Sequence, residues 1–262
     1  MIYPITFILF IFGLFVGSFV NVVIDRIGKG ETFVKGRSHC EFCKRDLKWF
    51  DLIPLLSFVF LKGKCRYCGK KLSYQYPLME IVTGILFLFS FTYALSLFPF
   101  ESVNFILVLL FSIVISCSLL SVFMIDLKYG IIPDNIIIFS SIVTFAYLLY
   151  FGNFLQNFLT AIGSAAFFLL LMLITKGKGM GMGDVKFAFL IGLLLGFPLV
   201  AISVYLAFLT GAIVSIILIL AGLKKFKKDT IPFGPFLAAC TLLSFFIGNK
   251  ILEILLKFLN FG

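Results

Sequence analysis

Two pairs of cysteines form the most specific pattern in the sequence. Two residues separate the members of each pair, and residues 44–64 separate the pairs. Two sulfurs at this spacing can reach one ion, and two such turns complete a tetrahedral site of four thiolates. The sequence therefore predicts a structural zinc ion held by Cys40, Cys43, Cys65 and Cys68. His39, the single histidine, is an alternative ligand.

Acidic side chains within or beside apolar segments form the second group. They are Glu80, Asp126, Asp134 and Asp184. A charge inside a membrane segment is costly, so such a residue is a candidate for function. Asp126 and Asp184 can form an aspartic dyad, in which one carboxyl keeps its proton while the other activates a water molecule. The alternative is two unrelated helix-end aspartates paired with Lys128 and Lys186.

Two glycines precede the second aspartate of this pair, in Gly181-Met182-Gly183-Asp184. They allow a tight backbone and a close approach of substrate. The sequence contains no serine elbow and no H-E-x-x-H helix. Asp25 stands beside a basic cluster and is interpreted as an ordinary boundary charge.

The high hydrophobic content of the whole chain indicates that these residues belong to a membrane protein. Of 262 residues, 61% are hydrophobic and 13% are charged, whereas soluble domains are about half apolar and about a quarter charged. A soluble, disordered or fibrous protein is therefore excluded, and an all-α polytopic membrane protein is expected. Apolar runs occur at 4–25, 77–99, 103–125, 135–152, 155–175, 185–222 and 233–255.

The run at 185–222 is too long for one helix, and Gly196-Phe197-Pro198 divides it. We therefore expect eight crossings, of which the sixth, 185–196, is short enough to require tilting or local thinning of the bilayer. Glycines four apart, at Gly13 and Gly17 and at Gly192 and Gly196, predict close helix packing within the chain.

Basic residues orient the eight crossings. Nearly all of the 22 Lys and Arg residues lie in segments on one side, including 26–71 and the cluster at 224–228. The positive-inside rule places these loops in the cytoplasm and both termini outside. The net charge of +10 is thereby explained by topology, and no nucleic-acid partner is expected.

Taken together, the motifs resemble those of the type IV prepilin peptidase family, in the wider G-x-G-D class of intramembrane aspartic proteases. The resemblance covers nearly the whole chain. Its matched stretches are 17–24, 37–40, 51–54, 63–68, 76–80, 126–127, 132–134, 181–186 and 231–235. One small departure is Glu41, where the family often has proline.

This resemblance implies an enzyme that removes the basic leader of prepilins and pseudopilins at the cytoplasmic membrane face. Asp126 and Asp184 would be the catalytic pair. The supporting residues would be Gly181, Gly183, Lys186, Asp134, Pro232, Gly234 and Pro235. For Asp134, the alternative is a helix N-cap. The stretch Pro232–Pro235 cannot be regular helix, and its backbone groups are expected to bind an extended substrate.

Members with a four-cysteine loop resemble bifunctional enzymes that also methylate the new N-terminus with S-adenosylmethionine. Glu80 is the candidate residue for methylation, and the alternative is a salt bridge to an Arg or Lys of the loop. The implied parts are a first transmembrane helix (1–25), a cytoplasmic zinc loop associated with methylation (26–76) and a seven-helix peptidase core (77–262).

The resemblance places the enzyme in the bacterial inner membrane, in type IV pilus biogenesis or type II secretion. Its partners would be prepilins and membrane lipid, and no oligomeric state is implied. Two other readings stay open. One is a transporter that uses the acids as an ion or proton path, and the other is a zinc-dependent scaffold without chemistry.

Overall fold

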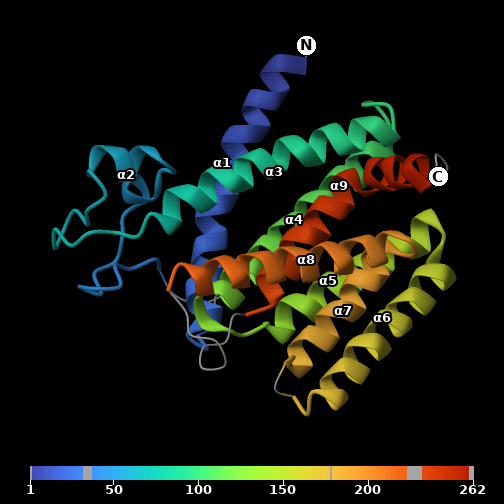
Figure 1. Cartoon of the computed structure of the whole chain (residues 1–262). Helices are drawn as coiled ribbons and strands as arrows, with labels where there is room; N and C mark the ends of the chain where they lie inside the picture. The colour runs from blue at the N-terminus through green and yellow to red at the C-terminus, as the bar shows by residue number, and fades with distance from the viewer. Residues whose placement is uncertain (1, 32–36, 178, 223–231, 260–262) are drawn as a thin grey trace. The chain divides into compact units, whose positions relative to one another are not determined.

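The computed structural model describes residues 2–31, 37–177, 179–222 and 232–259 (Figure 1). Within these ranges the chain is helical and contains no strand. The helices are α1 (Ile2–Gly28), η1 (Trp49–Leu52), α2 (Leu56–Phe60), α3 (Gln75–Leu97), α4 (Val103–Tyr129), α5 (Asp134–Phe151), α6 (Phe154–Ile174), α7 (Met182–Leu195), α8 (Leu199–Leu220) and α9 (Gly234–Leu259). The chain forms two compact units, Met1–Ile113 and Val114–Gly262, and the boundary falls inside α4.

Seven helices in the described part of the chain are long and apolar enough to cross a membrane. Large apolar side chains such as Ile8, Leu173 and Leu220 are 65%, 65% and 82% exposed, as expected for surfaces that face lipid. These findings confirm an all-α polytopic membrane protein. The expected short sixth crossing is α7, whose 14 residues span only ~21 Å of a hydrocarbon core of ~30 Å. The basic cluster 224–228 lies outside the described residues.

In the first unit, α1 and α3 pack closely along their glycines (Figure 1). A Cβ on Gly13 would lie 2.7 Å from Gly84 Cα, and one on Gly17 would lie 2.7 Å from Glu80 Cα. Contacts this short leave no room for a side chain, so the predicted role of Gly13 and Gly17 in packing is confirmed. The polar loop between the two helices carries η1 and α2.

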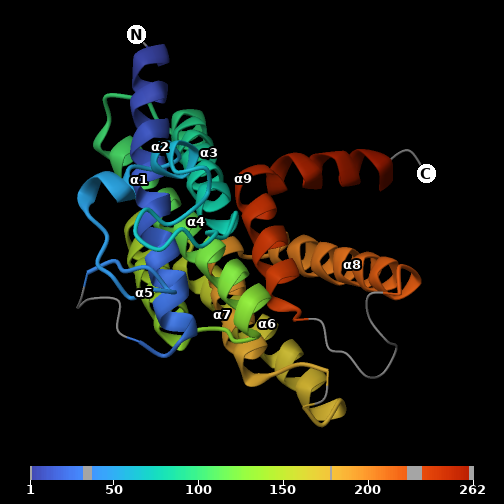
Figure 2. The same cartoon turned by 90° about the vertical axis from the view of Figure 1, so that its left-hand side faces the viewer.

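In the second unit, α7 packs against α6, and α8 packs against α9 (Figure 2). A Cβ on Gly192 would lie 2.7 Å from Ala161 Cα, which confirms the predicted close approach. Gly196 has a φ of 64° and ends α7, so the chain breaks where the sequence predicts it. Between α8 and α9, the buried hydroxyls of Ser203 and Thr241 lie 3.2 Å apart. Figure 2 also shows that α9 changes direction part-way along its length.

Candidate active site and metal centre

Asp126 lies in the last turn of α4 and is 4% exposed. Its carboxylate accepts a hydrogen bond from the backbone N–H of Gly234, the first residue of α9. The two residues touch: a Cβ on Gly234 would lie 2.5 Å from Asp126 Oδ2. The start of α9 therefore supports one carboxylate of the predicted pair, and only glycine fits there without displacing it.

Asp184 occupies the third position of α7. Its Oδ2 accepts a hydrogen bond of 2.9 Å from the backbone N–H of Gly181, the residue before the helix. A carboxylate in the first turn of a helix also meets the positive end of the helix dipole. The G-x-G-D segment therefore folds back on itself, and this fixes the second carboxylate.

The two aspartates belong to one cluster within the second unit. Asp126 interacts electrostatically with Asp184. The side chain of Ile132 packs against both glycines beside them: a Cβ on Gly183 would lie 3.1 Å from Ile132 Cβ, and one on Gly234 would lie 3.3 Å from Ile132 Cδ1. Two carboxylates held by separate helices, each with one backbone N–H, form an arrangement suited to aspartic protease chemistry.

Lys186 pairs with Asp134 rather than with Asp184. Its Nζ lies 2.8 Å from each carboxylate oxygen of Asp134, and both side chains are about half exposed. The sequence-based pairing of Lys186 with Asp184 is therefore wrong. The N-cap interpretation of Asp134 is also wrong, because Pro133 is the cap of α5 and Asp134 is its first helical residue, with its carboxylate turned to the lysine.

The stretch Pro232–Pro235 is more regular than its sequence suggests. α9 begins at Gly234, so Pro235 lies in its first turn. A proline there loses no helical hydrogen bond, because the first N–H groups of a helix have no partner within it. The expectation that the whole stretch is irregular is thus wrong. The N–H of Gly234 is directed to Asp126.

The cysteine pairs lie on two turns that repeat one hydrogen-bond pattern. In each turn, the residue four positions after the first cysteine donates its N–H to that cysteine's carbonyl at 2.9 Å, from Lys44 to Cys40 and from Gly69 to Cys65. Both donors have a positive φ, 55° and 69°. Isolated bridges close the turns between His39 and Asp46 and between Lys64 and Lys71.

The four sulfurs converge on one point. All four Sγ atoms lie within 4.8 Å of one another, and Cys40 Sγ and Cys68 Sγ are 3.9 Å apart. A tetrahedral zinc–thiolate site requires sulfurs about 3.8 Å apart, whereas a disulfide requires about 2 Å. The described cysteines therefore form a group that can hold a metal ion. The ring of His39 contacts the Arg37 carbonyl instead, with Nδ1 at 3.4 Å.

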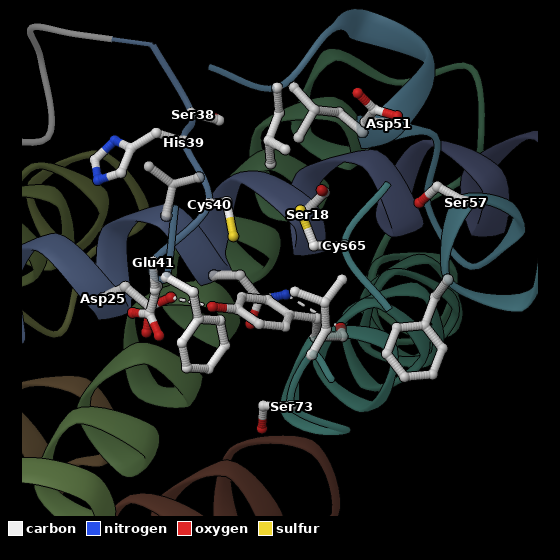
Figure 3. A pocket seen from close by; sticks show the side chains of 18 of the residues that line it. Ser18, Asp25, Ser38, His39, Cys40, Glu41, Asp51, Ser57, Cys65 and Ser73 are labelled. Carbon is white, nitrogen blue, oxygen red and sulfur yellow. Dashed lines mark hydrogen bonds between the residues drawn. The ribbon is translucent and has the colours of Figure 1, made fainter. Parts of the chain in front are cut away.

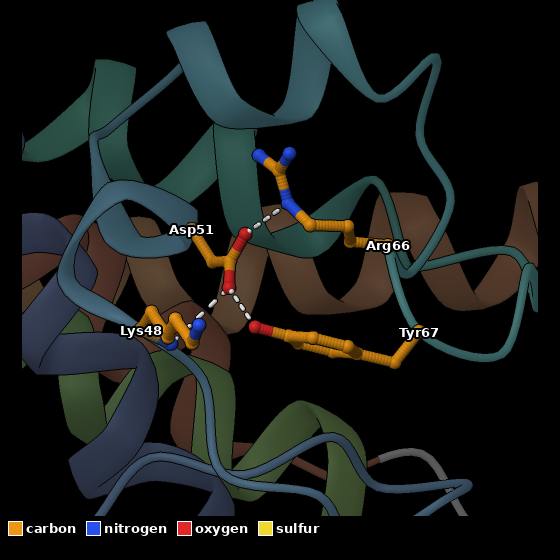
Figure 4. A network of polar contacts seen from close by, with 4 residues as sticks. All are labelled: Lys48, Asp51, Arg66 and Tyr67. Atoms are coloured by element: carbon orange, nitrogen blue, oxygen red, sulfur yellow. Dashed lines mark hydrogen bonds and ion pairs between the residues drawn. The ribbon is translucent and has the colours of Figure 1, made fainter.

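Asp51 ties the second turn to η1 (Figure 4). Its side chain is 3% exposed and accepts hydrogen bonds from Arg66 Nε (2.6 Å), the Tyr67 hydroxyl (3.0 Å) and the Lys48 N–H (3.1 Å). Burial alone raises the pKa of Asp51, but the hydrogen bonds from Arg66, Lys48 and Tyr67 outweigh it and hold the pKa below its ordinary value. Asp51 is therefore a charged anchor of the loop.

A cavity of about 230 Å³ lies within the first unit (Figure 3). Its wall is formed by α1, both cysteine turns, the η1–α2 segment and the start of α3. Glu80 belongs to this wall, is 7% exposed and accepts hydrogen bonds from the Leu55 N–H (2.8 Å) and from Ser18. These contacts to a backbone amide and a hydroxyl replace the salt bridge considered from the sequence.

Asp25, interpreted from the sequence as an ordinary boundary charge, also lies in this part of the structure. This residue lines the same cavity, and its Oδ2 accepts a hydrogen bond of 2.9 Å from the Tyr76 hydroxyl (Figure 3). Ser18, Asn21 and Asp25 recur at helical spacing on one face of α1. A polar stripe inside an apolar helix is the signal that could have identified it.

Two family models match the chain in order. One, the bacterial peptidase A24 N-terminal domain, matches residues 11–94, and the other, the type IV leader peptidase family, matches residues 113–216. No solved structure gives a significant match.

Three curated relatives match over nearly their whole length, and each is named prepilin leader peptidase/N-methyltransferase. The relative from Bacillus subtilis is 35% identical over 257 residues, which cover 95% of this chain and 97% of that protein. The relative from Xanthomonas campestris is 30% identical (94% and 92% covered), and that from Pseudomonas aeruginosa is 27% identical (99% and 97% covered). The chain belongs to the type IV leader peptidase family.

Proposed function

We propose that this chain is a prepilin leader peptidase that also methylates the N-terminus it creates. The observation that carries the first activity is the aspartate pair of the second unit, with each carboxylate held by a backbone N–H. The shared name of the curated relatives, prepilin leader peptidase/N-methyltransferase, supports both activities. The enzyme would act in type IV pilus biogenesis or type II secretion.

Cleavage needs one aspartate charged and one protonated. Two neighbouring carboxylates do not both ionise cheaply, and an aspartic dyad works with one proton shared between them. The charged member removes a proton from a water molecule, which attacks the scissile carbonyl. The protonated member donates a hydrogen bond to the carbonyl oxygen and later gives its proton to the leaving amine. Gly181 and Gly234 hold the carboxylates in place through their N–H groups.

Methylation is proposed for the first unit. Cys40, Cys43, Cys65 and Cys68 would hold a structural zinc ion, because their sulfurs have the spacing that this ion requires. S-adenosylmethionine would supply the methyl group. The zinc loop, 26–76, is the part associated with methylation, and 77–262 is the peptidase core. Cys40 and Cys65 also line the cavity, so metal binding would fix part of its wall.

The proposed location is the bacterial inner membrane. With α7 counted as a short eighth crossing beside the seven long apolar helices, the positive-inside rule would put the basic loops in the cytoplasm and both termini outside. The substrate enters from the same bilayer, since a prepilin is an apolar helix with a basic leader. Its leader stays on the cytoplasmic side, where the basic loops lie, and its helix docks among the spans.

The test is an intact-mass assay on purified enzyme with a prepilin and S-adenosylmethionine. The wild type should release the leader and add one methyl group, and Asp184→Asn should release none. Glu253→Gln, an exposed carboxylate on α9, is the matched control and should cleave like the wild type. Absence of cleavage by folded wild-type enzyme, on prepilins from its own source, would refute the proposal and favour a transporter.

A further inference from the structure

The connection 130–133 joins α4 to α5 beside the aspartate pair. Gly130 ends α4 with a φ of 67° and donates its N–H to the Asp126 carbonyl at 2.8 Å. Pro133 is buried and caps α5, and a residue that precedes proline favours extended backbone. Ile132 is that residue, and its β-branched side chain has few rotamers. The connection therefore presents one stiff side chain at a fixed place.

The side chain of Ile132 contacts both backbone segments that hold the aspartates. Toward α7, a Cβ on Gly183 would lie 3.1 Å from Ile132 Cβ and 3.6 Å from its Cγ1 and Cδ1. Toward α9, a Cβ on Gly234 would lie 3.3 Å from Ile132 Cδ1. Contacts this close mean that both segments rest directly on the isoleucine, so its width limits how closely they approach each other.

Each of these glycines is linked to one carboxylate of the pair. Gly183 directly precedes Asp184, whose N–H and carboxylate both bond to the backbone of Gly181. Gly234 donates its N–H to Asp126. A movement of either glycine therefore moves a reacting group, and the isoleucine belongs to the series of contacts that joins the two carboxylates.

A role in core packing alone does not account for this placement. Ile132 is partly exposed, whereas isoleucines of the core of this unit, such as Ile125 and Ile191, are fully buried. A partly exposed isoleucine contributes less hydrophobic stabilisation than a buried one. The geometry that Ile132 imposes on the aspartate pair explains its place better than the stability that it adds.

We propose that Ile132 is a positioning residue for leader cleavage, the spacer that sets the separation of Asp126 and Asp184. The inference rests on the proposed peptidase activity. An aspartic dyad needs both carboxylates at one water molecule and one carbonyl group, and a displacement of about 1 Å costs about 10²-fold in rate. The isoleucine takes no part in proton transfer and acts only by holding Gly183 and Gly234 apart.

The test is a double-mutant cycle in the full-length enzyme, with kcat and KM for leader cleavage as the readout. Ile132→Val removes only Cδ1, so it frees Gly234 but keeps the Cβ that faces Gly183. This variant should lower kcat by about three- to tenfold, because the start of α9 can then shift slightly. Its KM should change by less than about threefold. Ile131→Val, at a position that is 46% exposed, is the matched control and should cleave like the wild type.

Two alanine variants separate positioning from general stabilisation. A Cβ on Gly234 is confined by Ile132 Cδ1, so Gly234→Ala with Ile132→Val should cleave about tenfold faster than Gly234→Ala alone. A Cβ on Gly183 is confined chiefly by Ile132 Cβ, which valine keeps, so Gly183→Ala with Ile132→Val should be no faster than Gly183→Ala alone. Neither of these glycines has a positive φ, so alanine changes the contact and does not strain the backbone. An isoleucine that only stabilises the fold would rescue neither variant when it is shortened.

Rescue of both alanine variants, or of neither, would overturn the assignment. So would a rise in KM without a fall in kcat for Ile132→Val, because this result would show that the isoleucine binds substrate. Wild-type enzyme that cleaves no prepilin would refute the proposed function and this inference with it. Wild-type cleavage without the selective rescue would refute this inference alone.

Discussion

Gly234→Ala tests the contact that supports Asp126. The new Cβ would lie 2.5 Å from Asp126 Oδ2 and 3.0 Å from its Cγ. Ile132 Cδ1, 3.3 Å from the same Cβ, limits how far the alanine itself can shift away from the carboxylate. Ordinary contacts need about 3.5 Å, so the carboxylate must move by about 0.5–1 Å. A displacement of about 1 Å at reacting groups costs about 10²-fold in rate, equivalent to about 2.7 kcal/mol of barrier. We therefore expect kcat for leader cleavage to fall about 10²-fold.

Steady-state cleavage of a prepilin, with kcat and KM determined separately, measures this effect. Gly163→Ala on α6 is the matched control, because its Cβ meets nothing within 4 Å. It should leave cleavage unchanged and stabilise the helix by up to ~1 kcal/mol. A folded Gly234→Ala enzyme with the wild-type kcat would refute the contact. A rise in KM alone would instead indicate that Gly234 binds substrate.

Three further predictions follow from the loop and the membrane edge. The double change Cys40→Ser with Cys43→Ser should abolish zinc binding, measured by metal analysis, and damage methylation more than cleavage; intact methylation without zinc would contradict this. Asp51→Asn should make chelators extract zinc about tenfold more readily, or ~1.4 kcal/mol, since its partner Arg66 is partly exposed. The pKa of Asp51 lies below its ordinary value of 3.8, so its stabilising contribution is complete above pH 3.8 and is lost as the pH falls through the lower pKa of the folded protein. The difference in zinc extraction between the wild type and Asp51→Asn should therefore be the same at about pH 6 and pH 8. A difference that shrinks at pH 6 would contradict the assignment. Lys186→Met should lower stability by no more than ~1 kcal/mol by thermal unfolding, because its ion pair with Asp134 is about half exposed, and a larger loss would contradict this.

The sequence was sufficient for features that depend on composition and local spacing. Apolar runs fix the long helices, because a membrane segment must satisfy its backbone internally. The break at Gly196 and the glycine contact at Gly17 follow from local backbone requirements. The convergence of the four sulfurs follows from ligand spacing, since two residues between cysteines already place both sulfurs on one side of a turn.

Features that depend on which loop meets which helix were not accessible. In the sequence, Asp184 is the aspartate nearest to Lys186, whereas Asp134 is 52 residues away. Only the packing of α7 against α5 brings Asp134 to the lysine. The N–H of Gly234 is directed to Asp126 because α9 starts one residue before Pro235. The hydrogen bond from the Tyr76 hydroxyl to Asp25 likewise depends on the packing of α3 against α1.

The central claim is that Asp126 and Asp184 perform cleavage and are not needed for methylation. The most direct measurement is intact mass after incubation of Asp126→Asn and Asp184→Asn with two substrates, a prepilin and a pilin that already lacks its leader. We predict that neither variant releases the leader, whereas both methylate the shortened pilin within about threefold of the wild-type rate. Cleavage by either variant at the wild-type rate would contradict the account.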